Sequence, residues 1–313
     1  MALADLGNND LKLIIFGGKG GVGKTSCAIA TALALAENFK TLLISTDPAH
    51  SVSDCLDQQI GFKVLKVNHT AKLWAIEVVA DEALSEFKTE HKSELKKLLE
   101  TSTNLDNTDI DEMLALSIPG IDEVMSFKTI IDFIEEGQFE KYVVDTAPTG
   151  HALRLITSPK LLDEWIKVAA RMRWKYRYMI TSFAGSYHQD EVDAFLLSLK
   201  KTVKRIENLL KDSSKCEFIP VCIPETMAIS ETSRLLSDLG KSEIVPRQII
   251  VNNVMVSEDC SFCRSRKAGQ EKYLLQISEI FSTLNKIEIP VFAEEIHGLE
   301  SLDRLKECLF KTE

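Results

Sequence analysis

The sequence has no long apolar run and no excess of positive charge. No stretch approaches the roughly 18 uninterrupted apolar residues of a membrane-spanning helix, and the start MALADLGNND lacks the charged and apolar regions of a signal peptide. Asp and Glu outnumber Lys and Arg by 47 to 37, for a net charge of −10. Such an acidic chain is a poor general binder of nucleic acid or anionic membranes. We expect a cytoplasmic protein that does not itself span a membrane.

The sequence also lacks a disulfide framework. The odd number of seven cysteines, scattered over 313 residues, is unlike that of a secreted disulfide-rich domain. Only Cys260 and Cys263 are spaced like metal ligands. There is no internal repeat and no low-complexity segment, and the charged fraction of 27% with 45% hydrophobic residues is ordinary for a globular protein.

The most informative stretch that is present is Gly17 to Thr25, which reads GGKGGVGKT directly after the apolar run Leu11 to Phe16. It fits the phosphate-binding pattern G-x-x-x-x-G-K-[ST], in which backbone N–H groups cradle phosphates, the lysine pairs with the β/γ oxygens and the Thr hydroxyl binds Mg²⁺. The Ala/Leu-rich segment that follows predicts a helix to Ala36. The pattern therefore predicts a nucleotide and Mg²⁺ site, with a ligand-free glycine turn as the alternative. The expected nucleotide contacts are Gly18, Lys19, Gly20, Gly21, Val22, Gly23, Lys24, Thr25 and Ser26.

Lys19 is a second lysine inside this loop. Lys24 and the backbone amides already fill the space around the loop's own phosphates. Lys19 is better placed to cross a two-fold axis toward a partner's nucleotide, like an arginine finger given in trans. This placement favours a nucleotide-linked homodimer, and the alternative is an exposed lysine on a flexible loop.

Apolar, β-rich runs alternate with stretches long enough for helices, which predicts an α/β fold with a doubly wound, mainly parallel sheet. The runs are Leu11 to Phe16, Thr41 to Ser45, Leu73 to Val78, Tyr142 to Val144, Phe218 to Ile223, Gln248 to Val251 and Ile287 to Val291. Two intervals are too long for simple crossovers. We expect a P-loop NTPase core of residues 1–80, 114–158 and 216–313, with an inserted α-helical subdomain of residues 81–113 and 159–215.

Two acids follow predicted strands, Asp47 in DPAHSVSD and Asp145 in DTAPTGH. Strand carboxyl ends are where the γ-phosphate and Mg²⁺ should lie. We expect Asp47 to orient the attacking water and Asp145 to hold Mg²⁺ through water. An acid in this position is alternatively a helix N-cap.

Four segments, GGKGGVGKT, STDPAHSVSD, VVDTAPTGHALR and SIPGIDE, resemble the arsenite-pump ATPase family, and within it the branch that targets tail-anchored membrane proteins. The resemblance implies ATP as substrate and a symmetric homodimer that closes on ATP and opens after hydrolysis. By position, Asp47 resembles the catalytic switch I aspartate and Lys19 the lysine that crosses the dimer. The resemblance also implies that Asn252 reads adenine, that Glu225 lies beside the nucleotide, and that the segment Pro290 to His297, with Pro290 and Phe292, covers the base.

The residue type of Asn252 is consistent with adenine recognition, because an amide offers the donor and acceptor that distinguish adenine from guanine. A structural turn residue is the alternative reading of this asparagine.

The pair Cys260 and Cys263 supplies two of the four ligands of a structural zinc site. A two-fold axis between two copies would complete it, which resembles the zinc clip of the targeting branch. Free or redox-active thiols and an iron–sulfur cluster are the alternatives.

Two functions remain open. In the first, the helical subdomains of a dimer bind the transmembrane helix of a tail-anchored client and release it at a membrane receptor that the sequence does not identify. In the second, the protein is the ATPase subunit of an arsenite or anion efflux pump. The pump is disfavoured because no cysteine lies between Cys55 and Cys216. The first is weakened by the few methionines in or beside the inserts, Met113, Met125, Met172 and Met179.

Overall fold

The computed structural model describes residues 3, 6–47, 49, 51–102, 121–147, 162–164, 166–171 and 190–310. These residues divide into two compact units. Unit 1 comprises residues 1–79, 132–153 and 209–313, and unit 2 comprises residues 80–131 and 154–208. Met113, Met172 and Met179 lie outside the described residues.

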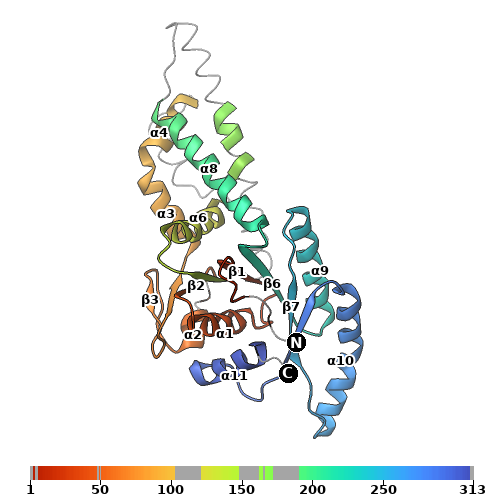
Figure 1. Cartoon of the computed structure of the whole chain (residues 1–313). Coiled ribbons are helices and arrows are strands. Elements are labelled where there is room, and N and C mark those ends of the chain that lie inside the picture. Colours follow the sequence, from red (N-terminus) through yellow and green to blue (C-terminus); the bar gives the residue numbers. More distant parts are fainter. Residues whose placement is uncertain are drawn as a thin grey trace, which may run out of the picture. The chain divides into compact units, whose positions relative to one another are not determined.

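Unit 1 contains an eight-stranded sheet of order β3-β4-β2-β5-β1-β6-β7-β8 (Figure 1). Every neighbouring pair is parallel except β3 and β4. The predicted α/β fold class is therefore confirmed. The strands are β1 (Leu13–Gly17), β2 (Thr41–Ser45), β3 (Leu65–Lys66), β4 (Leu73–Glu77), β5 (Lys141–Asp145), β6 (Cys216–Cys222), β7 (Gln248–Val254) and β8 (Asn285–Pro290).

The seven predicted strands correspond to all of these except β3. The residues of β3 are both exposed, so no apolar run marks this strand in the sequence. It pairs antiparallel with β4 at the edge of the sheet.

Helices cover both faces of the sheet, as a doubly wound fold requires. Because parallel crossovers are right-handed, the connection from β1 to β2 places α1 (Lys24–Ala36) on one face. The helices α2 (Ser51–Leu56) and α11 (Gly298–Phe310) contact α1 and lie on the same face. The same rule places α9 (Thr226–Lys241) and α10 (Ser261–Ile280) on the other face.

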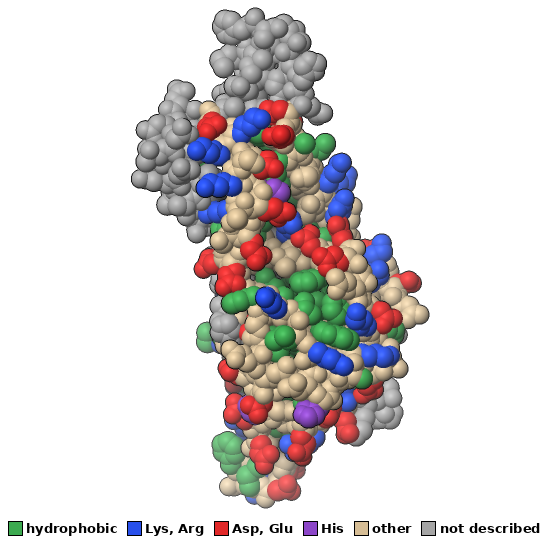
Figure 2. Space-filling view, turned by 90° about the vertical axis from the view of Figure 1, so that its left-hand side faces the viewer, with side chains coloured by type: hydrophobic (Ala, Val, Ile, Leu, Met, Phe, Trp, Pro, Cys, Tyr) green, Lys and Arg blue, Asp and Glu red, His purple; other side chains and the backbone are tan. Residues whose placement is uncertain are grey.

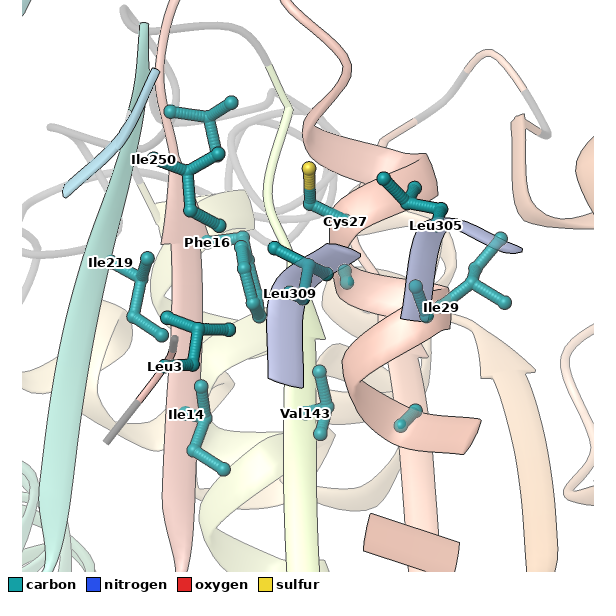
Figure 3. Packing of buried hydrophobic residues seen from close by; sticks show 14 of the residues in the cluster. Leu3, Ile14, Phe16, Cys27, Ile29, Val143, Ile219, Ile250, Leu305 and Leu309 are labelled. Atoms are coloured by element: carbon teal, nitrogen blue, oxygen red, sulfur yellow. The ribbon is translucent and has the colours of Figure 1, made fainter. Parts of the chain in front are cut away.

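The main core lies between the sheet and the pair α1 and α11, which pack against each other. Figure 3 shows side chains of β1, β5, β6 and β7 directed toward residues of these helices, among them Ile29, Leu305 and Leu309. The backbone N–H of Leu3 donates to the carbonyl of Leu309 at 2.8 Å. This bond ties Leu3 to the last helix.

The β3 edge of the sheet is partly apolar. Hydrophobic side chains are visible there beside lysines in Figure 2. Phe62 and Leu65 are exposed, and the ammonium groups of Lys40 and Lys66 lie over the ring of Trp74. A very short strand with lysines beside it is a common way to protect a sheet edge from further pairing.

Unit 2 is helical and has a hydrophobic cluster of its own. The chain enters it with α3 (Ala80–Glu90) and α4 (Lys92–Ser102), and α6 (Ile121–Glu136) and α8 (Glu191–Lys211) begin in it. The apolar stripe of α8 contributes Val192, Phe195, Leu196, Leu199 and Val203 to this cluster. Both α6 and α8 continue into unit 1, so the boundaries differ from the predicted residues 81–113 and 159–215.

No helix in the described ranges is both long enough and apolar enough to span a membrane.

Candidate functional site

The loop between β1 and α1 runs past the carboxyl end of the sheet, and its glycines are required by close contacts. A side chain at Gly18 would meet the carbonyl oxygen of Val221 at 2.3 Å. Gly23 has φ 91° and is the N-cap of α1, and a Cβ there would lie 2.3 Å from Nδ2 of Asn252. Only glycine combines this left-handed conformation with the absence of a side chain.

The amino terminus of α1 has no side-chain cap, and its first turn contains no acidic residue of its own. The unpaired N–H groups and the positive end of the helix dipole are therefore left for an anion, as in phosphate-binding loops.

Lys24 begins α1 and is 5% exposed. Its Nζ donates to the carbonyl oxygen of Lys19 at 3.3 Å. Burial lowers the pKa of Lys24, while the charges of Asp145 and Asp47 act in the opposite direction. The ammonium group is thus held at the loop, close to both acids.

Asp145 ends β5, between Phe16 of β1 and Ser45 of β2 in the sheet register. Its side chain is fully buried, and its Oδ2 accepts a hydrogen bond of 2.8 Å from Oγ1 of Thr25. Oγ1 of Thr25 also lies 3.2 Å from Oγ of Ser51.

The second oxygen of this carboxylate, Oδ1 of Asp145, is buried without a hydrogen-bond partner in the described part of the chain. A buried oxygen acceptor without a partner, next to the Thr25 hydroxyl, fits a Mg²⁺ ion or its bound water. Burial raises the pKa of Asp145 to about 7, against the lowering effects of the Thr25 hydrogen bond and the Lys24 charge.

Asp47 follows β2 and is partly buried. Its Oδ1 accepts from the backbone N–H of Ala49 at 3.0 Å, and its own N–H donates to Oγ of Ser45 at 3.2 Å. The carboxylate is therefore anchored through one oxygen. The negative charge of Asp47 raises the pKa of both Lys24 and Asp145, so the three groups lie close enough to interact in one site.

Glu77 was not predicted as part of the site. It ends β4, is 1% exposed, and its Oε1 accepts from the N–H and the hydroxyl of Ser53 at 3.1 and 3.0 Å. These bonds fix the short helix α2, which begins at Ser51. The sequence feature that could have indicated this residue is an acid at the end of the apolar strand Leu73–Glu77.

The residues predicted to lie beside the base are in or after β6, β7 and β8, on the side of β1 away from β5. Asn252 is in β7, and its Nδ2 donates to the carbonyl oxygen of Val22 at 2.9 Å. Glu225 is the exposed N-cap residue of α9, in the short connection that follows the end of β6 at Cys222. Pro290 ends β8, and Phe292 packs against the main core. Asn252 is thus in direct contact with the glycine loop.

The predicted zinc site is not supported. Cys260 and Cys263 are joined as a disulfide, in which neither sulfur is a thiolate ligand. Cys260 is the N-cap of α10 and its Sγ accepts from the N–H of Cys263 at 3.0 Å. Among the described residues there is no group of three or more His, Cys, Asp or Glu side chains that could hold a metal ion.

The fold and this loop define a P-loop NTPase. The family model described as Anion-transporting ATPase matches residues 11–311. Similar proteins include ATPase ASNA1 homolog 1 of Paramecium tetraurelia, which is 34% identical over 98% of this chain and 94% of the relative. The ATPase ASNA1 homolog of Dictyostelium discoideum is 35% identical over 98% and 92%. An ATPase named get3 from Pyrenophora tritici-repentis is 32% identical over 98% and 93%.

The chain belongs to this ATPase family, which confirms the predicted family and the prediction of an ATP hydrolase.

The buried acid generates a pH-dependent prediction for the nucleotide-free protein. An acid whose pKa rises from 3.8 to about 7 on folding stabilises the fold fully below pH 3.8, and this contribution is lost as the pH rises toward 7. The loss corresponds to roughly 4 kcal/mol at most. Asp145→Asn should therefore unfold at a higher urea concentration than the original protein at pH 8, and at a similar one at pH 4. An equal shift at both pH values would contradict a buried ionisable group.

Proposed function

We propose that the chain is a Mg²⁺-dependent ATPase that acts in the cytoplasm as a homodimeric targeting factor. It binds the transmembrane segment of tail-anchored proteins and releases it at a membrane. One observation supports the nucleotide site most strongly. The glycine loop precedes a helix without a side-chain cap, and the Thr25 hydroxyl in that helix donates a hydrogen bond to Asp145. The targeting role is supported by the ASNA1 and GET3 relatives together with the motif resemblance.

Each polar group has a part in hydrolysis. The loop amides and Lys24 bind the phosphates, and Lys24 offsets negative charge on the β and γ groups. Bound Mg²⁺ supplies further charge neutralisation, and it would be held by Thr25 Oγ1 and, directly or through water, by Asp145 Oδ1. Asp47 holds the attacking water with the oxygen that is not bonded to Ala49.

Replacing Asp47 should separate binding from turnover. Asp47→Asn preserves the bond from Ala49 but loses the negative charge that orients the water, so ATP affinity should stay within a few-fold. The value of kcat should fall by about 10² to 10⁴. Asp54→Asn, an exposed acid of α2, is the matched control and should behave like the original protein. Normal turnover in Asp47→Asn would remove this residue from the mechanism.

Lys19 would act on the nucleotide bound by the second copy of a dimer. In the described part of the chain its side chain makes no ion pair or hydrogen bond, while its backbone carbonyl accepts from Lys24. Its own loop already has a buried lysine, so a second copy is the natural site of action for its charge.

Mixing two inactive variants distinguishes action in trans from action within one chain. Lys19→Ala should lower kcat by roughly 10³ to 10⁵ if Lys19 stabilises the transition state. A mixed dimer of Lys19→Ala and Asp47→Asn chains contains one site with its own Asp47 and the partner's Lys19. This mixture should therefore regain activity in an ATPase assay, whereas each variant alone should not. No recovery in verified mixed dimers would contradict action in trans.

Client binding is assigned to unit 2. A transmembrane segment is about 20 residues and 30 Å long, and covering 1,000 Å² of it would contribute roughly 25 kcal/mol gross. In the described residues of unit 2, only Val168 and Leu197 are large hydrophobic side chains with high exposure. We expect binding to expose part of the cluster on α8 and to involve both copies of a dimer.

An anion pump remains the second candidate, because the matching family is described by anion transport. Residues 56–215, which include all of unit 2, contain no cysteine that could bind a metalloid.

Two parallel assays separate the candidates. Co-expression with a protein that ends in an apolar anchor should give co-purification, and a matched protein with charged residues in the anchor should not. Arsenite should leave the ATPase rate unchanged. Stimulation by arsenite without capture of the anchor would favour the pump subunit instead.

A further inference from the structure

Asn252 joins two parts of the nucleotide site through a single side chain. Its Nδ2 donates to the carbonyl oxygen of Val22 at 2.9 Å, and the residue is 6% exposed. Gly23, the next residue of the loop, has φ 91°, and a Cβ there would lie 2.3 Å from the same nitrogen. The glycine loop and β7 are therefore in direct contact at this amide.

The backbone of β7 is shaped to place this amide. The pairing of β7 with β8 shifts register between Val251 and Val254, and Asn253 has φ 59°. Bulges of this kind redirect a side chain from the regular pleat. Gln270 of α10 holds the irregular segment, since its Nε2 donates to the carbonyl of Asn253 at 3.0 Å and its Oε1 accepts from the N–H of Met255 at 2.8 Å.

The oxygen end of the Asn252 amide differs from the nitrogen end in its surroundings. Its Oδ1 is buried without a hydrogen bond in the described part of the chain. Leaving a buried acceptor unpaired costs about 1 to 3 kcal/mol, so this oxygen favours a ligand with an N–H donor. The 6-amino group of adenine is such a donor, whereas guanine presents a carbonyl oxygen at the same position.

The Val22 carbonyl also fixes the orientation of the amide. Only the nitrogen end of Asn252 can face a carbonyl oxygen, because the oxygen end has no hydrogen to donate. An amide that rotated by 180° to suit guanine would place Oδ1 against the Val22 oxygen. The loop contact therefore determines which edge of a base can bind.

We infer that Asn252 is a positioning residue that couples base recognition to the shape of the phosphate loop. This inference rests on the proposed nucleotide site. The bond to Val22 holds the loop just before Lys24, and the same bond keeps Oδ1 available for adenine. Loss of the side chain should therefore weaken phosphate binding even when no base is present.

Binding of three Mg²⁺-loaded probes, ATP, GTP and inorganic tripolyphosphate, tests this coupling by calorimetry on the full chain. Asn252→Ala should bind tripolyphosphate about fivefold or more weakly, because one hydrogen bond to the loop is lost. It should bind ATP more weakly still, and its preference for ATP over GTP should approach 1. Asn252→Asp keeps an acceptor for the base but places an oxygen against Val22, so binding of all three probes should fall while the preference for ATP persists.

Asn285→Ala, the same truncation at the first residue of β8, is the matched control and should leave all three affinities unchanged. Circular dichroism and the melting temperature establish that each variant is folded. Unchanged tripolyphosphate affinity in folded Asn252→Ala, with ATP binding weakened, would overturn the coupling and leave the nucleotide site in place. Failure of the original protein to bind ATP would overturn both.

Discussion

A carboxylate that is completely buried at the carboxyl end of the sheet constrains the site around it. Asp145 lies between the ends of β1 and β2, with one oxygen bonded to Thr25 and the other without a partner among the residues that the structure describes. An isolated negative charge in such surroundings is unfavourable, and the raised pKa expresses this cost. The arrangement becomes favourable when a proton or a cation is present. In the proposed function a metal-bound triphosphate would supply that cation to the carboxylate that the sheet holds in place.

The glycine loop connects this acid to the opposite side of the sheet. On one side Thr25 contacts Asp145, and on the other Val22 contacts Asn252. Only two residues separate Val22 and Thr25 in the chain, so both contacts lie on one short, sterically restricted segment. In the proposed function, the phosphates and the base would therefore act on the same few peptide groups, although the side chains that bind them belong to different strands.

The sequence was sufficient to predict the parts of the structure that depend on local pattern. The apolar runs located the interior strands, and GGKGGVGKT located the loop, but the exposed strand β3 has no such run. Contacts between distant residues were beyond this reasoning, as Ser53 with Glu77 and Val22 with Asn252 illustrate. The spacing of Cys260 and Cys263 is equally suitable for a disulfide and for two metal ligands, so the pattern alone did not distinguish these states.

The helix α8 shows the same distinction in energetic terms. Its periodic apolar residues predict a buried stripe, yet the pattern does not specify whether the chain itself or a client covers it. In unit 2 the chain covers it, with Phe87 of α3 and Leu98 of α4 in the same cluster. A client helix would then replace one apolar contact by another, so the net free energy is far smaller than the gross burial of roughly 25 kcal/mol. When the competing states are this close, a nucleotide-linked coupling of about 1 to 3 kcal/mol is sufficient to change which of them predominates.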